Sequence, residues 1–165
     1  PWPESAYVQE LYFNRCAHYF VLELLDPGES SVQFDHRRRK TMTLLGFVGM
    51  RVEGERGHIS TLAVRTEWRG RRLGEVLLLV ALRQAIEDGA QVVGLEVRIS
   101  NEVAQSLYSK YGFEARTRLR RYYADGEDAF YMQVKVGGDV EFRHRVEAEL
   151  SYLMSDQAIE MVGTD

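Results

Sequence analysis

The sequence predicts one α/β domain, with a mixed and mostly antiparallel sheet flanked by helices, from three observations. The chain has 165 residues, of which 45% are hydrophobic and 28% charged, as is usual for one folded domain. Residues 58–99 follow the order strand, loop, helix, strand, which predicts a crossover between two neighbouring parallel strands. Short turns between other strand-like stretches predict antiparallel hairpins beside that crossover.

The first third of the chain predicts one helix and then strands. Apolar residues at helical spacing predict a helix over residues 4–12. Aromatic and branched residues predict a strand over 17–25. Two further strands, over 41–52 and 58–64, are joined by a glycine-containing turn and predict a hairpin.

The centre of the chain predicts two helices and the strand between them. A charged loop over 65–72 leads into a helix over 73–88, which Gly89 ends, and a strand over 92–99 follows at once. The second helix begins after Ser100 or Asn101, either of which can cap it. Its apolar face is Val103, Ala104, Leu107, Tyr108 and Tyr111, with Lys110 in the last turn and Gly112 just beyond.

The last third predicts two strands and a terminal helix. The strands, over 113–121 and 128–136, enclose a polar loop. We expect the core domain to span residues 1–136 and a C-terminal extension to span 137–165. Apolar residues recur every three or four positions in the extension and predict an amphipathic helix that packs on the domain or on a partner; they are Phe142, Val146, Leu150 and Leu153.

Composition excludes several classes of protein. The formal charge of −4 gives no overall attraction to nucleic acid, so direct nucleic-acid binding is not expected. The single cysteine, Cys16, excludes an internal disulfide and a cysteine-based zinc cluster, and indicates a reducing, cytoplasmic location. The longest apolar run, 76–82, is too short to span a membrane. The four histidines lack metal-ligand spacing, so no metal is expected.

The first motif that could carry chemistry is Arg69-Gly70-Arg71-Arg72-Leu73-Gly74, between a predicted strand and a predicted helix. Free N–H groups at a helix N-terminus, glycines and arginines together suit an anionic ligand such as a phosphate. A solvated basic loop is the alternative reading. The motif lacks the Gly-Lys-Ser/Thr ending of a nucleoside triphosphate site and the three glycines of a dinucleotide site.

This loop resembles the Arg/Gln-x-x-Gly-x-Gly/Ala loop of the GNAT superfamily of acyl-CoA-dependent N-acetyltransferases, which also follows a strand and opens a helix. The resemblance is strong over residues 58–136 and loose over 1–52. Later segments are similar to the RimI-type branch, the protein N-terminal alanine acetyltransferases. They are Leu95-Glu96-Val97-Arg98, Ser100-Asn101-Glu102, Ala104, Leu107-Tyr108, Tyr111-Gly112-Phe113, Arg120-Arg121-Tyr122-Tyr123, Glu127-Asp128-Ala129 and Met132.

The resemblance implies a GNAT fold that uses acetyl-CoA as co-substrate. It also implies that the chain lacks the first strand and the start of the first helix, so that one sheet edge is incomplete. Arg72 stands where the family loop usually has its first glycine. This arginine would either hinder the approach of the pyrophosphate or point its side chain outward. The C-terminal extension has no counterpart in the family.

The resemblance further implies a set of cofactor-binding residues. The strand residues Leu62, Ala63 and Val64 would hold the pantetheine arm and the acetyl group. The loop and first helical turn would meet the pyrophosphate, and Asn101 and Lys110 match further CoA contacts. Asn101 could instead be only a helix cap, and Lys110 only a partner of the helix dipole. The pyrophosphate residues are Arg69, Gly70, Arg71, Arg72, Leu73, Gly74 and Glu75.

Two residues are candidates for proton transfer. Acetyl transfer needs a neutral amine, and Glu96, within a predicted strand, can serve as the base. The alternative is that Glu96 pairs with Arg98, two residues along on the same face. By resemblance, Tyr108 would protonate the departing CoA thiolate, whereas by spacing alone it belongs to the apolar helix face.

The polar loop before the last strand is the candidate acceptor surface. Tyr122 and Tyr123 resemble the family's tyrosine pair, which lies over the incoming peptide N-terminus, although either could belong to the core. Arginines alternate along the preceding strand and predict one basic face, which could meet an acidic substrate, the CoA adenosine phosphate or RNA, or could simply be solvated. They are Arg116, Arg118, Arg120 and Arg121.

We therefore expect an acetyl-CoA-dependent N-acetyltransferase that acts by direct transfer on protein N-termini, of the ribosomal-protein-alanine type. The expected partner is a protein or peptide N-terminus, a ribosomal protein among the candidates, and the expected state is a monomer or weak dimer. One alternative is an acetyltransferase for a small amine or a lysine side chain. Another is a non-catalytic CoA-binding module. An RNA-binding protein is the third.

Overall fold

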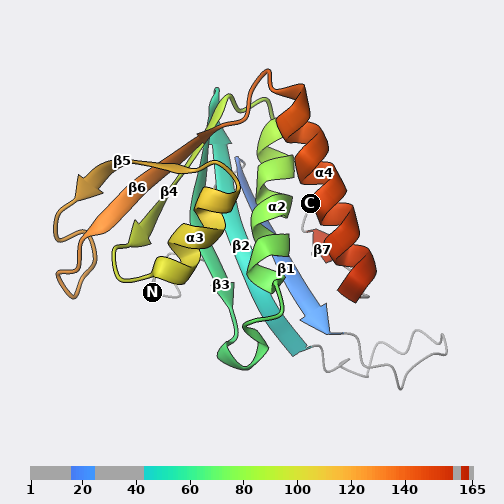
Figure 1. Ribbon diagram of the computed structural model, residues 1–165, viewed down its shortest axis with the longest axis horizontal. Coiled ribbons are helices and arrows are strands. Elements are labelled where there is room, and N and C mark those ends of the chain that lie inside the picture. The colour runs from blue at the N-terminus through green and yellow to red at the C-terminus, as the bar shows by residue number, and fades with distance from the viewer. Residues whose placement is uncertain (1–15, 25–42, 158–160, 164–165) are drawn as a thin grey trace.

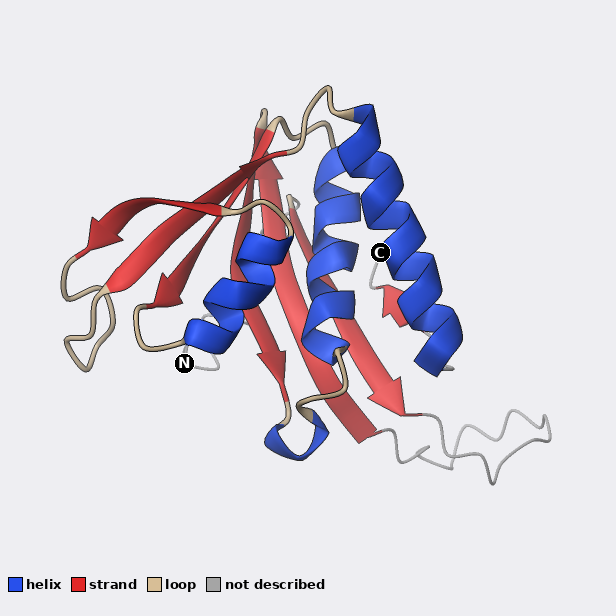
Figure 2. Ribbon diagram, viewed as in Figure 1, coloured by secondary structure: helices blue, strands red, loops and turns tan. Residues whose placement is uncertain are grey.

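The structure, a computed structural model, describes residues 16–24, 43–157 and 161–163, so the predicted helix over 4–12 lies outside the described residues. The elements pack as one sheet with helices on one face (Figures 1 and 2). The helices are α2 (Leu73–Glu87), α3 (Glu102–Lys110) and α4 (Val140–Gln157), with a short 3-10 helix η1 (Thr66–Trp68). The strands are β1 (Ala17–Leu24), β2 (Thr43–Glu53), β3 (Arg56–Val64), β4 (Val92–Arg98), β5 (Glu114–Leu119), β6 (Ala129–Lys135) and β7 (Met161–Gly163).

The predicted mixed sheet is confirmed. Its seven strands run in the order β5-β6-β4-β3-β2-β1-β7, and among the described pairs only β3 and β4 are parallel. The crossover through α2 joins these two strands, as the order of the elements predicts. The bounds of the six strands that we expected agree with the structure to within two residues.

The sheet edge that we expected to be incomplete is paired. β1 forms antiparallel pairs with β2 on one side and with β7 on the other, where Phe20, Val21 and Leu22 face Gly163, Val162 and Met161. β7 lies within residues 137–165, which we expected to form an extension, so a segment from the far end of the sequence lies beside β1.

α2 packs both on the sheet and on α4, which lies beside it (Figure 1), and this explains its composition. All seven residues of the apolar run 76–82 have no exposed surface, because one side of the helix packs on β1, β2 and β3 and another on α4. The four apolar residues of α4 that we expected to share a face, Phe142, Val146, Leu150 and Leu153, are all buried in the same core.

α3 has the predicted signals at both ends. The Asn101 side chain caps the helix by accepting a hydrogen bond from the backbone N–H of Ala104 at 3.2 Å. Gly112, with φ of +81°, turns the chain out of the helix into β5. The buried face of α3 carries Tyr108, and Tyr111 just beyond it is also buried.

Candidate active site

The sheet opens where β3 and β4 separate. The two strands pair only from Arg56 with Val92 to Ile59 with Leu95. Beyond this point β3 continues to Val64, whereas β4 continues along β6 (Figure 1). In the described sheet, the backbone groups of 62–64 that point toward β4 thus lack a strand partner and can pair with an extended ligand, as the edge of a sheet does. Leu62, Ala63 and Val64 are all partly buried there.

The N-terminus of α2 lies next to this opening. A Cβ atom placed on Gly74 would lie 3.7 Å from Val64, 3.8 Å from Leu62 and 3.9 Å from Leu107 of α3. These are ordinary van der Waals distances, so α2, β3 and α3 come together at Gly74 and a Cβ atom would fit there. Of the other loop residues, Leu73 is buried, and Arg69, Gly70 and Arg71 are exposed, with the guanidinium of Arg71 lying 4.4 Å over the ring of Trp68.

Arg72 is the N-cap residue of α2 and has left-handed backbone angles, φ of 60° and ψ of 11°. These angles favour glycine, which gives a physical reason for the glycine that the family loop carries here. The side chain turns back onto the protein: Nε donates to Glu75 Oε2 at 2.8 Å, and Nη2 lies 3.7 Å from Glu149 Oε2 of α4. Arg72 is therefore held between α2 and α4, instead of pointing freely outward.

Glu75 is the buried centre of this loop, with 7% of its surface exposed. Its carboxylate accepts hydrogen bonds from Arg72, from Lys110 and, at 2.5 Å, from the hydroxyl of Tyr111. Burial raises the pKa of Glu75, but these three hydrogen bonds outweigh burial and lower that pKa to about 2. The resemblance implies that Glu75 lies at the pyrophosphate and Lys110 at another CoA contact; in the structure the two side chains contact each other.

Glu96, on β4, belongs to a second cluster of polar side chains. Its Oε2 lies 2.8 Å from Nε2 of His58 on β3, and the two side chains are 18% and 27% exposed. The alternative that Glu96 pairs with Arg98 is wrong, because Arg98 pairs with Asp125 and Glu127 of the loop between β5 and β6. Sequence reasoning missed His58. The signal that could have found it is its place on β3, the strand predicted to neighbour the one carrying Glu96.

The two predicted acceptor tyrosines lie beside Glu96. Tyr122 is 48% exposed, and its ring lies 5.2 Å from that of Tyr123, edge to face. Burial, the charge of Glu96 and a hydrogen bond to Glu96 together raise the pKa of Tyr122. Burial and the same carboxylate also raise the pKa of Tyr123, while the positive charge of Arg98 opposes the rise. Both hydroxyls are therefore protonated at neutral pH.

Tyr108 is the remaining candidate for proton transfer. It is buried on α3, where its ring lies 5.8 Å from that of Phe113. Burial, with a smaller contribution from Tyr123, raises the pKa of Tyr108 to about 12. The structure thus brings Tyr108, Tyr123, Tyr122 and Glu96 into one electrostatically connected group, while Arg72, Glu75 and Lys110 form the other.

The prediction that the arginines of β5 share one basic face is wrong. A bulge between Ala115 and Thr117 leaves Arg116 out of register, which breaks the alternation that would align the arginines. Arg116 pairs with Glu114 at 2.9 Å, and Arg118 pairs with Asp128 at 2.7 Å.

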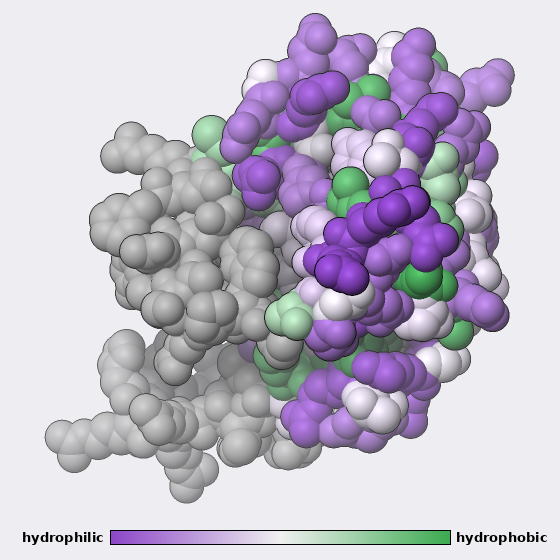
Figure 3. Space-filling view, turned by 90° about the vertical axis from the view of Figure 1, so that its left-hand side faces the viewer, coloured by the Kyte–Doolittle hydropathy of each residue, from purple (hydrophilic) through white to green (hydrophobic). Residues whose placement is uncertain are grey.

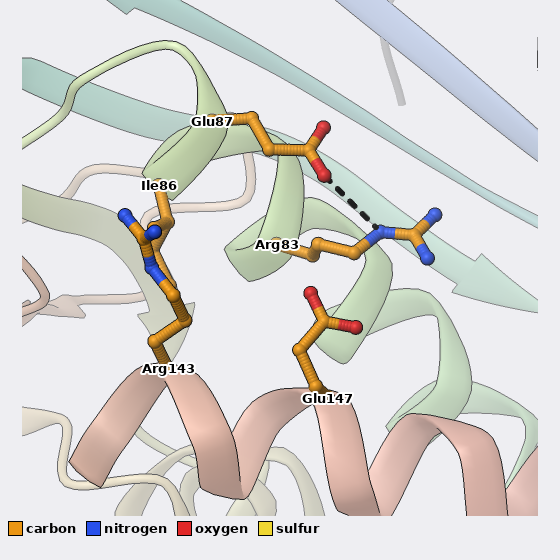
Figure 4. A pocket seen from close by; sticks show the side chains of 5 residues that line it. All are labelled: Arg83, Ile86, Glu87, Arg143 and Glu147. Carbon is orange, nitrogen blue, oxygen red and sulfur yellow. Dashed lines mark ion pairs between the residues drawn. The ribbon is translucent and has the colours of Figure 1, made fainter. Parts of the chain in front are cut away.

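A separate hollow of about 280 Å³ lies between the C-terminal end of α2 and the start of α4 (Figure 4). Arg83, Ile86 and Glu87 reach it from α2, and Arg143 and Glu147 from α4. Arg83 and Glu87 pair at 3.9 Å. The predicted site residues do not line this hollow. In the described parts of the chain, no group of three His, Cys, Asp or Glu side chains is arranged to hold a metal ion.

A sequence profile of the family described as Acetyltransferase (GNAT) matches residues 1–113, which is more than half of the chain. The chain belongs to the GNAT acetyltransferase family. It is an N-acyltransferase, with acetyl-CoA as its co-substrate. Within the residues that the structure describes, no helix is long and apolar enough to cross a membrane.

Relatives place the chain within this family. It is 34% identical over 137 residues to a Bacillus subtilis (strain 168) protein assigned as a ribosomal protein bS18-alanine N-acetyltransferase, covering 82% of this chain and 80% of that one. It is 43% identical over 79 residues to an N-alpha-acetyltransferase of Sulfurisphaera tokodaii, and this match covers 47% of each chain. The crystal structure of the ribosomal-protein-S18-alanine N-acetyltransferase from Escherichia coli matches with a TM-score of 0.65 and 26% identity, over 86% of this chain and 81% of that one.

Proposed function

We propose that this acetyltransferase transfers the acetyl group of acetyl-CoA to the α-amine at the N-terminus of a protein, of the ribosomal-protein-alanine type. One observation carries the proposal: Glu96 lies beside the opening between β3 and β4, where its carboxylate contacts His58 and, together with burial, raises the pKa of the half-exposed Tyr122. The relatives from B. subtilis and E. coli, both assigned to ribosomal-protein alanine, support the acceptor class.

The residues present fit acetyl-CoA. The free side of strand residues 62–64 suits the extended pantetheine arm, and their N–H groups can polarise the thioester carbonyl. The N-terminus of α2, which begins at Leu73 and Gly74, suits the pyrophosphate. Arg72 and Lys110, both partly exposed, supply positive charge, and Asn101 lies at the N-terminus of α3. Arg69, Gly70, Arg71 and Leu73 complete the proposed set.

The proposed reaction is a direct transfer in which two side chains move protons. An α-amine, with an ordinary pKa of about 8, is mostly protonated at pH 7, so Glu96 first takes one proton from it, through a water molecule, and the neutral amine then attacks the thioester carbonyl. Once the new C–N bond has formed, the nitrogen releases its second proton to water. Nε2 of His58 holds the Glu96 carboxylate in place. Tyr108, which stays protonated because its pKa is about 12, gives its proton to the thiolate released when the C–S bond breaks.

The α-amine is the proposed acceptor because its proton is easier to remove than that of lysine. The lysine ammonium has an ordinary pKa of about 10.4, more than two units above that of an α-amine. Tyr122 and Tyr123 supply the surface over which the first residues of the acceptor would lie.

Intact-mass analysis of three acceptors tests the proposal. The purified chain is incubated with acetyl-CoA and a peptide that begins Ala-Arg-Tyr, with an N-terminally blocked peptide that carries one lysine, or with a polyamine. We expect one acetyl group on the free N-terminus alone. Transfer only to lysine or to the polyamine would contradict the acceptor class, and CoA binding without transfer to any amine would contradict catalysis.

A further inference from the structure

The side chain of Arg98 attaches the loop that carries Tyr122 and Tyr123 to β4. Nη1 of Arg98 donates to Asp125 at 2.8 Å and to Glu127 at 2.6 Å. The guanidinium also lies 3.9 Å over the centre of the Tyr123 ring. Two carboxylates and one aromatic ring of the same loop therefore meet a single cation.

Glu127 fastens the loop at a second position. Its Oε1 accepts hydrogen bonds from the backbone N–H of Ser100 at 3.0 Å and from the Ser100 hydroxyl at 2.6 Å. The backbone O of Glu127 accepts from the N–H of Tyr123 at 3.1 Å, and the O of Tyr123 accepts from the N–H of Gly126 at 2.8 Å. The loop is thus a closed turn, attached to Arg98, the last residue of β4, and to Ser100, two residues beyond it.

The backbone just before the tyrosines is strained. Arg121 has φ of +49°, an angle that a residue with a side chain rarely adopts. Its N–H donates to Asp128 Oδ1 at 2.8 Å, and the other oxygen of Asp128 accepts from Arg118 at 2.7 Å. Such strain persists only where surrounding contacts hold it, so the hydrogen bonds of this loop fix the direction in which Tyr122 leaves the hairpin.

Arg98 and Glu96 share one face of β4, because side chains two residues apart in a strand point the same way. We propose that Arg98 is a positioning residue, which holds Tyr123 and its neighbour Tyr122 at a fixed place over Glu96 and so sets the binding of the acceptor N-terminus. This inference deepens the proposed function and depends on it. It names a clamp, Arg98 with Asp125 and Glu127, that acts through the tyrosines.

Ion pairs that are exposed to water contribute little to the free energy of unfolding, which favours a positioning role for Arg98 over a role in global stability. The side chain of Arg98 is 35% exposed and that of Asp125 is 59% exposed, and pairs so accessible to water add little to the stability of a fold. The surface on this side of the described molecule is mainly hydrophilic (Figure 3). The loop therefore relies on polar contacts, such as those of Arg98, for its order.

Replacement of Arg98 by methionine tests the proposal, with Arg83→Met as the matched control. Arg83 is also paired with a glutamate and is 34% exposed, but it lies at the C-terminal end of α2.

For Arg98→Met we expect the KM for the Ala-Arg-Tyr peptide to rise about tenfold, with kcat and the acetyl-CoA Kd changed less than about threefold. Arg98→Lys keeps the charge but loses the planar stack on Tyr123, so its KM should be intermediate. Arg83→Met should match the wild type.

Amide hydrogen exchange gives a readout that is independent of turnover. The N–H groups of Tyr123 and Gly126 should exchange at least about tenfold faster in Arg98→Met than in the wild type, and should be unchanged in Arg83→Met. Unchanged exchange and an unchanged peptide KM in Arg98→Met would overturn the inference and leave the proposed function intact. A wild-type chain that acetylates no α-amine would overturn both.

Discussion

Glu75 and Glu96 are two carboxylates on successive elements of the chain, α2 and β4, and they have opposite surroundings. Glu75 is 7% exposed and accepts hydrogen bonds from an arginine, a lysine and a tyrosine, which lower its pKa to about 2. The side chain of Glu96 is 18% exposed, lies beside the opening of the sheet, and contacts His58 and the half-exposed Tyr122.

The difference separates a carboxylate that holds structure from one that is placed to react. Three donors satisfy Glu75 and fix it in the ionised form, so it anchors Arg72 and Lys110 at the cofactor loop. Glu96 instead lies where an acceptor amine can approach. A buried, fully paired acid is thus expected to affect stability, and a partly exposed acid beside the opening is expected to affect turnover.

The largest expected effect is that of Glu96→Gln on turnover. Loss of the base should lower kcat about 100- to 10,000-fold at pH 7, without weakening acetyl-CoA binding. Because an α-amine loses its proton unaided near pH 8, the defect should shrink as the pH rises from 7 to 9. Steady-state rates across this range check the prediction. A kcat equal to that of the wild type at pH 7 would show that Glu96 is not the base.

Tyr108→Phe should have the next largest effect. The phenylalanine keeps the packing against Phe113 but cannot protonate the thiolate, so kcat should fall about 10- to 100-fold, with a melting temperature close to that of the wild type. Since the pKa of Tyr108 is about 12, the wild type should lose no activity through Tyr108 ionisation below about pH 11. A kcat of Tyr108→Phe equal to that of the wild type would show that Tyr108 contributes only to packing.

Glu75→Gln should act on stability instead. Removal of the charge weakens three hydrogen bonds at a buried site and should cost about 1 to 3 kcal/mol of unfolding free energy, a fall of several degrees in melting temperature. Because the folded pKa is lowered from 4.5 to about 2, the advantage of the wild type is full above about pH 4.5 and disappears as the pH falls toward 2.

Urea denaturation at pH 7 and at pH 3 measures this advantage. The control is Glu87→Gln, at a side chain that is 58% exposed and lies 3.9 Å from its arginine, where we expect less than about 0.5 kcal/mol. Equal losses in the two variants would contradict the structural role of Glu75.

The smallest effect concerns the backbone of Arg72. Arg72→Gly and Arg72→Ala both remove the contacts with Glu75 and Glu149, so their difference isolates the cost of a positive φ. The glycine variant should be more stable than the alanine variant by about 1 kcal/mol. Paired urea curves measure the difference. A more stable alanine variant would show that residue 72 has a different backbone conformation.

Local signals in the sequence predicted most of the fold. The capping residue Asn101 and the terminating Gly112 predicted the two ends of α3. The order strand, helix, strand predicted that β3 and β4 are parallel. The pairing of β7 with β1 could not be predicted, because no local signal links two strands at opposite ends of the chain. The bulge at Arg116 could not be predicted for a similar reason, since it depends on the register between β5 and β6.

The resemblance named candidate members of the site but not the contacts that these residues make. Glu96, Tyr108, Tyr122 and Tyr123 were named from a resemblance, and the structure brings them together. The partners of each acid were not found: His58 is 38 residues from Glu96, and Lys110 is 35 residues from Glu75. Such contacts form only when separate elements pack, so spacing along the chain does not contain them.

Single-turnover acetyl transfer to the Ala-Arg-Tyr peptide, measured with Glu96→Gln and Glu75→Gln side by side at saturating acetyl-CoA, tests the contrast between the two acids most directly. We expect Glu96→Gln to transfer at least about 100-fold more slowly than the wild type with an unchanged melting temperature. Glu75→Gln should transfer within about threefold of the wild type and melt several degrees earlier. Equal losses of transfer rate, or a larger loss in Glu75→Gln, would contradict the assignment of Glu96 as the reacting carboxylate.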